Sequence, residues 1–325
     1  MSAIKASLNR VYALELARVT ERAAVAAAHH RGRGNEVAAD QAAVDAMRAE
    51  LNSLDITGTV VIGEGERDEA PMLYIGEKVG NGKGPEVDIA LDPLEGTTLC
   101  AKSMPNSLAV LAMSEGGGML NAPDTYMDKI AIGGGYPDGV VSIDADPGDN
   151  IRELARAKGV PTHQITACIL DRPRHAEQIE SVRSAGGRVH LITDGDIAGV
   201  IATTNPAETD IDIYLGIGGA PEGVLAAAAL RCIGGQMQGR LVIRNEEEET
   251  RARRMGINDL ARIYSLHDLA AGDVLFAATG VTDGSMLSGV RFRADKIVTE
   301  TVVMRSISGT VRWIRSEHAR LDKFT

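Results

Sequence analysis

The chain has 325 residues, of which 44% are hydrophobic and only 3% aromatic, so Ala, Val, Ile and Leu must fill a large core, in one big domain or two smaller ones. Its formal net charge of −11 at pH 7 argues against nucleic acid as a partner. We expect a cytoplasmic protein, because the three cysteines are an odd number, no apolar run reaches the roughly 18 residues of a membrane span, and no signal peptide opens the chain.

Two helices are expected at the start of the chain. Residues 8–29 are rich in Ala, Leu, Glu and Arg, with apolar residues at helical spacing and Gly32 as a stop. Residues 40–51 form the second helix, whose apolar face includes Ala43 and Met47. Asp40 lies at the start of this second helix.

A first acidic turn follows the short apolar strand expected at residues 58–62. Glycines on both sides of Glu64 let the chain bend sharply and leave its carboxylate unobstructed. Open α/β sheets place ligands at the carboxyl ends of strands, so we expect Glu64 to be a ligand. For Glu66, Asp68 and Glu69, which come next, a solvated acidic loop is expected.

A second acidic turn, Asp92-Pro93-Leu94-Glu95-Gly96-Thr97-Thr98, follows a strand expected at residues 87–91. Pro93 is predicted to stop that strand, which leaves Asp92 and Glu95 close together on a stiff turn. Two carboxylates beside the hydroxyls and N–H groups of a helix start suit metal-assisted phosphoryl chemistry. A strand-ending turn with a capping Thr is the alternative, and the turn alone does not decide between them.

The second half of the chain alternates between strands and helices. Strands are expected at 165–170 and 188–192, and helices at 175–184 and 197–203. This alternation predicts an α/β layer with a partly parallel sheet. A change of composition near residue 147 predicts two parts, 1–147 with the metal site and 148–325 with the substrate site. Residues 246–254 are expected to form a solvated helix, and residues 298–314 to add strands.

Cationic and acidic groups in this half are candidate substrate contacts. Arg172 and Arg174 flank Pro173, which lets two guanidinium groups converge on one phosphate. Asp194-Gly195-Asp196 follows a strand and can accept hydrogen bonds from sugar hydroxyls or cap a helix. Tyr126 offers a phenol or simply packs. Glu222 opens a helix at 224–232, where it binds a metal or complements the helix dipole.

The ordered set of motifs resembles class II fructose-1,6-bisphosphatase, a bacterial member of the lithium-sensitive phosphatase superfamily. The matching segments include Val61-Ile62-Gly63-Glu64-Gly65-Glu66, Asp92-Pro93-Leu94-Glu95-Gly96-Thr97, Asp171-Arg172-Pro173-Arg174-His175, Gly216-Ile217-Gly218-Gly219-Ala220-Pro221-Glu222-Gly223 and Ala278-Thr279-Gly280-Val281-Thr282-Asp283-Gly284. The resemblance covers nearly the whole chain. It implies alternating helix and sheet layers, as in sugar phosphatases and inositol monophosphatase-like proteins, and hydrolysis of the 1-phosphate of fructose-1,6-bisphosphate in gluconeogenesis.

The resemblance also implies the site. The Mg²⁺ or Mn²⁺ ligands would be Asp40, Glu64, Asp92, Glu95 and Glu222, and the catalytic residues Asp40, Glu64 and Thr97. The substrate contacts would be Glu95, Gly96, Thr97, Tyr126, Arg172, Pro173, Arg174, Asp194, Gly195, Asp196 and Gly219. Asn35 and Glu36 depart from the Asp-Lys pair that the family often carries, and Glu36 reverses a charge that would help to hold phosphate.

Three alternatives stay open at this point. The chain could prefer sedoheptulose-1,7-bisphosphate or accept both bisphosphates, or it could be a broader sugar or inositol phosphatase. A sugar-phosphate sensor without catalysis is the alternative outside the enzymes, and Glu36 is the feature that favours it. The resemblance implies a homodimer or homotetramer.

Overall fold

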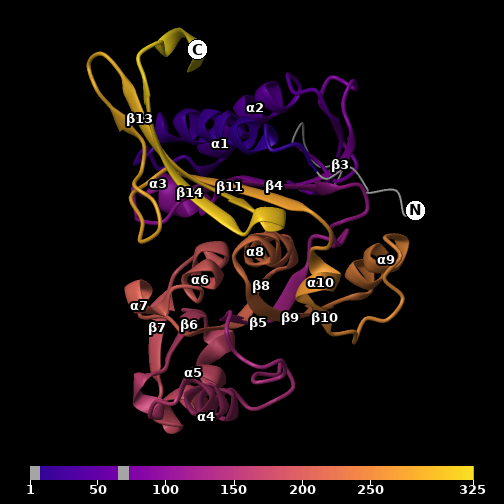
Figure 1. Ribbon diagram of the computed structural model, residues 1–325, viewed down its shortest axis with the longest axis vertical. Helices are drawn as coiled ribbons and strands as arrows, with labels where there is room; N and C mark the ends of the chain where they lie inside the picture. Colours follow the sequence, from indigo (N-terminus) through magenta and orange to yellow (C-terminus); the bar gives the residue numbers. More distant parts are fainter. Residues whose placement is uncertain (1–7, 65–72, 325) are drawn as a thin grey trace. The chain divides into compact units, whose positions relative to one another are not determined.

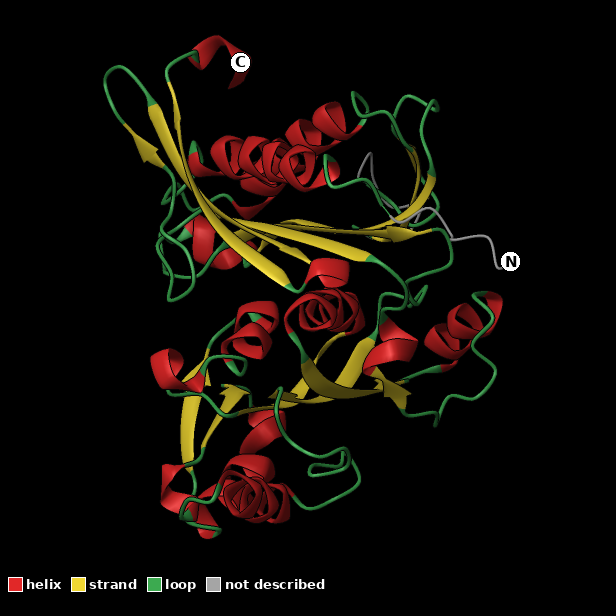
Figure 2. Ribbon diagram, in the orientation of Figure 1, coloured by secondary structure: helices red, strands yellow, loops and turns green. Residues whose placement is uncertain are grey.

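A computed structural model describes residues 8–64 and 73–324 (Figures 1 and 2). Gly65 and Glu66, and the loop residues Asp68 and Glu69, lie outside this range. The chain divides into two compact units, Met1–Leu120 with Ala270–Thr325 and Asn121–Leu269. This division differs from the one expected near residue 147, because the strands after residue 270 pair with those of the first unit. Among the described residues, no helix is both long and apolar enough to cross a membrane.

The first unit holds a mixed sheet covered by two long helices. Its helices are α1 (Tyr12–Ala28), α2 (Glu36–Leu51) and α3 (Thr97–Ala101), with the 3₁₀ turns η3 (Ser306–Ser308) and η4 (Leu321–Phe324). Its strands are β1 (Thr57–Ile62), β2 (Lys78–Val79), β3 (Glu86–Glu95), β4 (Leu108–Glu115), β11 (Val274–Gly280), β12 (Arg291–Phe292), β13 (Ile297–Arg305) and β14 (Thr310–His318).

The strands of this unit run in the order β12-β13-β11-β4-β3-β1-β2, and β14 pairs with β13. Among the described strands of this unit, only β1 and β3 pair in parallel. The helix α1 packs over β11, β13 and β4, and α2 packs beside it over β3 (Figure 1). Small residues such as Ala23 and Ala43 are fully buried in this core, which explains how the unit packs with few aromatic side chains. Trp313 on β14 is exposed over 63% of its surface.

The second unit is a six-stranded sheet with helices on both faces. Its strands are β5 (Tyr126–Gly133), β6 (Thr166–Leu170), β7 (Arg188–Ile192), β8 (Ile213–Gly219), β9 (Gly235–Val242) and β10 (Tyr264–Ser265). Its helices are α4 (Pro147–Lys158), α5 (Ala176–Ser184), α6 (Asp196–Ala202), α7 (Pro206–Thr209), α8 (Ala220–Ile233), α9 (Glu246–Arg254) and α10 (Leu266–Leu269), with the 3₁₀ turns η1 (Thr162–Gln164) and η2 (Pro173–His175).

The strand order of this unit is β10-β9-β5-β8-β6-β7. The strands β7 and β8 flank β6 in parallel, while β5 pairs antiparallel with β8 and β9, which confirms the partly parallel sheet. The helices α4 and α5 cover one face of the sheet, and α6 and α8 the other (Figure 2). Side chains on β5 alternate accordingly. Ile130 packs into the core with Leu154 of α4, and Met127 lies against Gly223 of α8.

Most predicted elements are present, and several of their boundaries differ from the prediction. The helix α2 begins at Glu36, four residues before the predicted start, because Asn35 caps it by accepting a hydrogen bond from the N–H of Ala38 at 3.0 Å. The prediction that Pro93 stops its strand was wrong. The strand β3 continues to Glu95, because a shift of register against β4 between Asp92 and Glu95 accommodates the proline. Likewise, α8 begins at Ala220, before the start expected at residue 224.

Candidate active site

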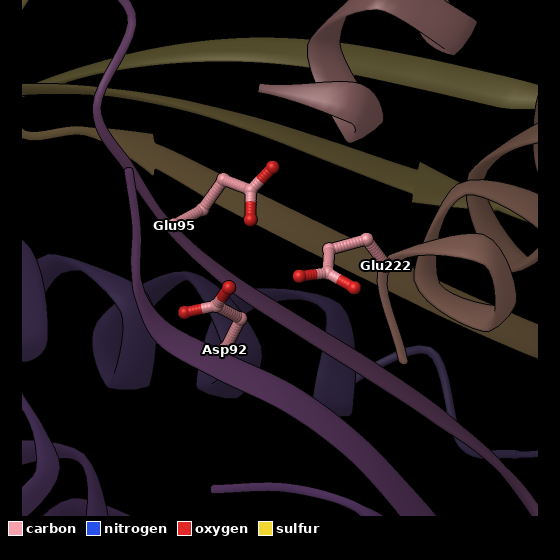
Figure 3. Close-up of side chains that lie close together, drawn as sticks. All are labelled: Asp92, Glu95 and Glu222. Atoms are coloured by element: carbon pink, nitrogen blue, oxygen red, sulfur yellow. The ribbon is translucent and has the colours of Figure 1, made fainter. Parts of the chain in front are cut away.

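The irregular end of β3 brings two carboxylates together. A carboxylate oxygen of Asp92 and one of Glu95 lie within 4.8 Å of each other. Figure 3 shows both side chains rising from this strand. An oxygen of Asp92 accepts a hydrogen bond from the N–H of Leu94 at 3.0 Å, and the hydroxyl of Ser107 donates to the carbonyl of Glu95 at 3.1 Å. The bulge that admits Pro93 therefore also fixes the two acidic groups.

Asp40 on α2 adds a third acidic group near this pair. Its side chain is buried, with 8% of its surface exposed. Burial, and then the negative charge of nearby Asp92, raise the pKa of Asp40 to about 6. The fold thus holds carboxylates against their mutual repulsion, and a cation among them would relieve it. Oxygen ligands of this kind suit hard divalent ions such as Mg²⁺ and Mn²⁺.

Glu64 lies at the neighbouring strand end. Ile62, the last residue of β1, is paired with Ala90 of the parallel strand β3, and Glu64 and Asp92 each lie two residues beyond this pair. Gly63 has to be glycine, because a Cβ atom there would lie 2.1 Å from the carbonyl oxygen of Leu73. The N–H of Glu64 donates to that same oxygen at 3.0 Å. The glycine and this bond fix the position of the Glu64 backbone.

The turn after β3 leads directly into α3. Gly96 has a φ of +75°, and a Cβ atom at this position would lie 2.8 Å from a side-chain carbon of Leu99. Thr97 then begins the helix, as predicted, and is half-buried. Gly96 thereby sets the direction in which Thr97 leaves the acidic strand end.

Glu222 lies in the first turn of α8, in the second unit. Its carboxylate folds back over Gly219, where a Cβ atom would lie 1.8 Å from one of its oxygens. Gly219 in turn pairs with Tyr126 across β8 and β5. The backbone of the second unit therefore places two predicted substrate contacts, Tyr126 and Gly219, side by side.

Arg174 packs against the Tyr126 ring, with its guanidinium carbon 5.0 Å from the ring centroid. Its Nε and Nη2 atoms both donate to the carbonyl oxygen of Ile217, at 3.0 and 2.7 Å. Buried His175 holds the same residue, because its Nε2 accepts from the N–H of Ile217 at 2.9 Å. Its Nδ1 lies 2.8 Å from the carbonyl oxygen of Leu170 and donates to it, so the ring is neutral. Burial lowers the pKa of His175, in agreement.

The other predicted contacts of this unit differ in their surroundings. The Nη1 atom of half-buried Arg172 donates to the carbonyl of Asp171 at 3.1 Å, and Pro173 begins η2. An oxygen of Asp194 accepts from the N–H of Gly195 at 3.1 Å. Asp196 begins α6 and is buried, with 5% of its surface exposed, so one of its oxygens is engaged inside the protein.

That internal partner is Lys129, which the sequence reasoning missed. The ammonium group of Lys129 pairs with Asp196 and donates to the carbonyl of Gly219 at 2.9 Å. The Lys129 side chain is fully buried. Lys129 lies on β5, whose sequence is that of an ordinary half-polar strand. A lysine on such a strand usually faces solvent, so no signal in the sequence marked it. Lys129 links α6 to the end of β8.

Both residues of the departure at Asn35 and Glu36 have a local structural role. Asn35 caps α2, and Glu36, which is exposed, occupies its first turn, where a negative charge complements the helix dipole. This local role accounts for both residues and does not favour a sensor over an enzyme.

Comparisons with known proteins agree with the resemblance. The family of bacterial, glpX-encoded fructose-1,6-bisphosphatases matches residues 10–318. Fructose-1,6-bisphosphatase 1 class 2 of Escherichia coli (strain K12) is 46% identical over 325 residues, which cover 96% of each chain. The class 2 fructose-1,6-bisphosphatase of Shigella flexneri is equally similar over the same share. The chain therefore belongs to the family of glpX-encoded, class 2 bacterial fructose-1,6-bisphosphatases.

Proposed function

We propose that this protein hydrolyses the 1-phosphate of fructose-1,6-bisphosphate, giving fructose-6-phosphate and inorganic phosphate, in the gluconeogenesis of the bacterial cytoplasm. The family membership supports this proposal over nearly the whole chain. The observation that carries it is the acidic strand end, where Asp92 and Glu95 lie together and the charge of Asp92 contributes to the raised pKa of Asp40. An acidic site of this kind repels a phosphate ester unless a cation is bound.

The cation we propose is Mg²⁺ or Mn²⁺, held by Asp40, Glu64, Asp92, Glu95 and Glu222. These ligands offer only carboxylate oxygens, which hard divalent ions prefer. When bound, the ions would neutralise the reacting phosphate and lower the pKa of a water molecule. The same ions would offset both the burial and the repulsion from Asp92 that raise the pKa of Asp40.

The protein's own residues then have distinct roles. Asp40 accepts a proton from the attacking water, with the hydroxyl of Thr97 orienting that water for in-line attack. Glu95, Gly96 and Thr97 surround the reacting phosphate.

The remaining contacts recognise the rest of the substrate. Arg172 and Arg174, with Pro173 between them, hold the 6-phosphate, because guanidinium groups bind phosphate in bidentate fashion. The contacts to the sugar are completed by Tyr126, Asp194, Gly195, Asp196 and Gly219.

We infer a homodimer or homotetramer, and light scattering coupled to size-exclusion chromatography would measure the number of subunits.

A phosphate-release assay tests the function. The purified protein should release phosphate from fructose-1,6-bisphosphate with Mg²⁺ or Mn²⁺ and lose that activity in a chelator. Rates of phosphate release from sedoheptulose-1,7-bisphosphate and inositol-1-phosphate, measured under the same conditions, show which of the alternative activities the protein has. Binding of fructose-1,6-bisphosphate without release in either metal would instead indicate a sensor.

A further inference from the structure

We propose that Arg244 is a specificity-determining residue that contacts the non-reacting phosphate of the sugar bisphosphate, alongside Arg174. This inference rests on the proposed function and extends it to a residue outside the motifs of the family resemblance. Arg244 follows β9 by two residues, and Val242, the last residue of that strand, is paired with Tyr126. The strand pairing therefore brings Arg244 to the same strand end as Tyr126.

The first observation is that two guanidinium groups share one aromatic ring. The guanidinium carbon of Arg244 lies 4.4 Å from the centroid of Tyr126, and that of Arg174 lies 5.0 Å from it. Cation–π attraction draws each group to the ring, but two positive charges around one small ring also repel each other. A phosphate dianion held by both would replace that repulsion with charge-assisted hydrogen bonds.

The second observation is that the protein anchors the same edge of both guanidinium groups. Nε and Nη2 of Arg174 donate to the Ile217 carbonyl, and Nε and Nη2 of Arg244 donate to one oxygen of Glu248. In the part of the chain that the structure describes, Nη1 of neither arginine has a hydrogen-bond partner. Each side chain is thus held in place with N–H groups still available to a ligand.

The third observation is the support behind Arg244. The carboxylate of Glu248 is buried, with 7% of the side chain exposed, and its second oxygen accepts from the N–H of Arg244 at 2.8 Å and from the hydroxyl of Thr125 at 3.1 Å. Thr125 precedes Tyr126, so one carboxylate ties Arg244 to the strand that carries the ring.

The charges around Arg244 leave room for an anion. Glu248 neutralises one of the two guanidinium groups, and exposed Asp124 is the other acidic side chain that acts on Arg244. Within the described residues, Arg174 donates to a neutral carbonyl and forms no ion pair that would offset its positive charge. A pair of anchored arginines, one of which is paired with a carboxylate, therefore still carries positive charge that a phosphate can bind.

The test compares Arg244→Ala and Arg244→Gln with Arg253→Ala. Arg253 is a matched control, because it also pairs with a glutamate four residues away and its side chain is 49% exposed, against 51% for Arg244. Two quantities are measured with Mg²⁺ present: kcat and KM for fructose-1,6-bisphosphate, and the inhibition constant of fructose-6-phosphate, which bears only the non-reacting phosphate.

We expect both Arg244 variants to raise KM and the inhibition constant about tenfold or more, with a smaller fall in kcat, since hydrogen bonds to charged groups are lost. Arg253→Ala should match the parent protein. Arg244→Gln can still donate a hydrogen bond to Glu248. If KM and the inhibition constant stayed normal in this variant, Arg244 would have only a structural role, and the proposal would be overturned. A fall in kcat with unchanged KM would overturn it as well. An inactive parent protein would refute the proposed function instead.

Discussion

The first unit gathers negative charge at its acidic strand end, and the second unit gathers positive charge in an arginine cluster, Arg174 and Arg244. The two groups of charges are stabilised in opposite ways. Around Asp40, Asp92 and Glu95, the fold gathers like charges, and burial together with the charge of Asp92 raises the pKa of Asp40. Around Tyr126, each guanidinium is anchored by an acceptor of the same unit, either the Ile217 carbonyl or Glu248. The first arrangement is incomplete without a cation, whereas the second is stable by itself and keeps donors for an anion.

The largest effect is expected from breaking the internal charge pair of the second unit. Lys129→Met leaves the carboxylate of Asp196 buried without its cation, which should lower the free energy of unfolding by about 3–5 kcal/mol. Urea unfolding followed by circular dichroism measures this loss. Adding Asp196→Asn should recover part of it. Arg152→Met, which removes an exposed pair with Asp149, is the control and should cost less than about 1 kcal/mol.

The next effect tests the acidic strand end directly. Glu64→Gln keeps the shape of the side chain and removes its charge. Activity should fall by roughly two orders of magnitude, which corresponds to about 3 kcal/mol of transition-state stabilisation. The measurement is kcat/KM across a Mg²⁺ and Mn²⁺ titration. Near-normal activity at saturating metal would contradict a ligand role for Glu64, and Glu86→Gln, an exposed position at the start of β3, supplies the control.

A smaller effect is expected from the arginine cluster. Arg174→Ala should raise KM for fructose-1,6-bisphosphate more than it lowers kcat, because the lost contact holds a phosphate that does not react. A substrate that carries only the reacting phosphate, fructose-1-phosphate, should be nearly unaffected. The ratio of the two kcat/KM values would therefore approach unity. Arg174→Lys should restore only part of the loss, since an ammonium lacks the guanidinium fork. Equal damage to both substrates would place Arg174 at the chemical step or in the fold.

The smallest effect links charge to stability. Asp40 has a higher pKa in the folded protein, about 6, than its ordinary 3.8, so the unfolded chain releases this proton first as the pH rises. In a chelator, ionisation of Asp40 should therefore lower the free energy of unfolding progressively between about pH 4 and pH 6, by roughly 2 kcal/mol.

Asp40→Asn should remove that loss and melt at a higher temperature than the parent protein at pH 7.5, although it should be inactive. At pH 4 the two proteins should melt alike. Asp45→Asn, at an exposed position of the same helix, controls for the change of net charge. Equal melting temperatures at pH 7.5 would show that the repulsion around Asp40 is relaxed without metal.

The sequence marked Glu64, Asp92 and Glu95 as candidates, because each lies at the end of a strand beside a glycine or proline, whereas Asp40, within α2, was indicated only by the family resemblance. Thr97 was placed correctly at a helix start for the same reason. The path through Pro93 was not predictable, since a bulge depends on how β4 pairs with β3. The division of the chain also depends on long-range pairing, because β11 joins β4 across more than a hundred residues.

The second unit shows which contacts such reasoning misses. Lys129 and Arg244 lie on or near strands whose neighbours in space are distant in sequence, and neither belongs to a turn motif. His175 was part of a recognised motif, yet its role in holding Ile217 depends on two backbone groups from different strand ends. Local patterns identify residues that shape their own turn, and tertiary pairing decides which others join them.

The position of the one tryptophan has a practical consequence for spectroscopy. Trp313 lies on β14, in the first unit, and most of its surface is already in solvent in the folded protein. Its emission should therefore shift little on unfolding, and it carries no direct signal from the second unit, where Lys129 is buried. An unfolding curve recorded by intrinsic fluorescence would underreport the loss of this protein's structure, so a backbone signal is the appropriate probe of its stability.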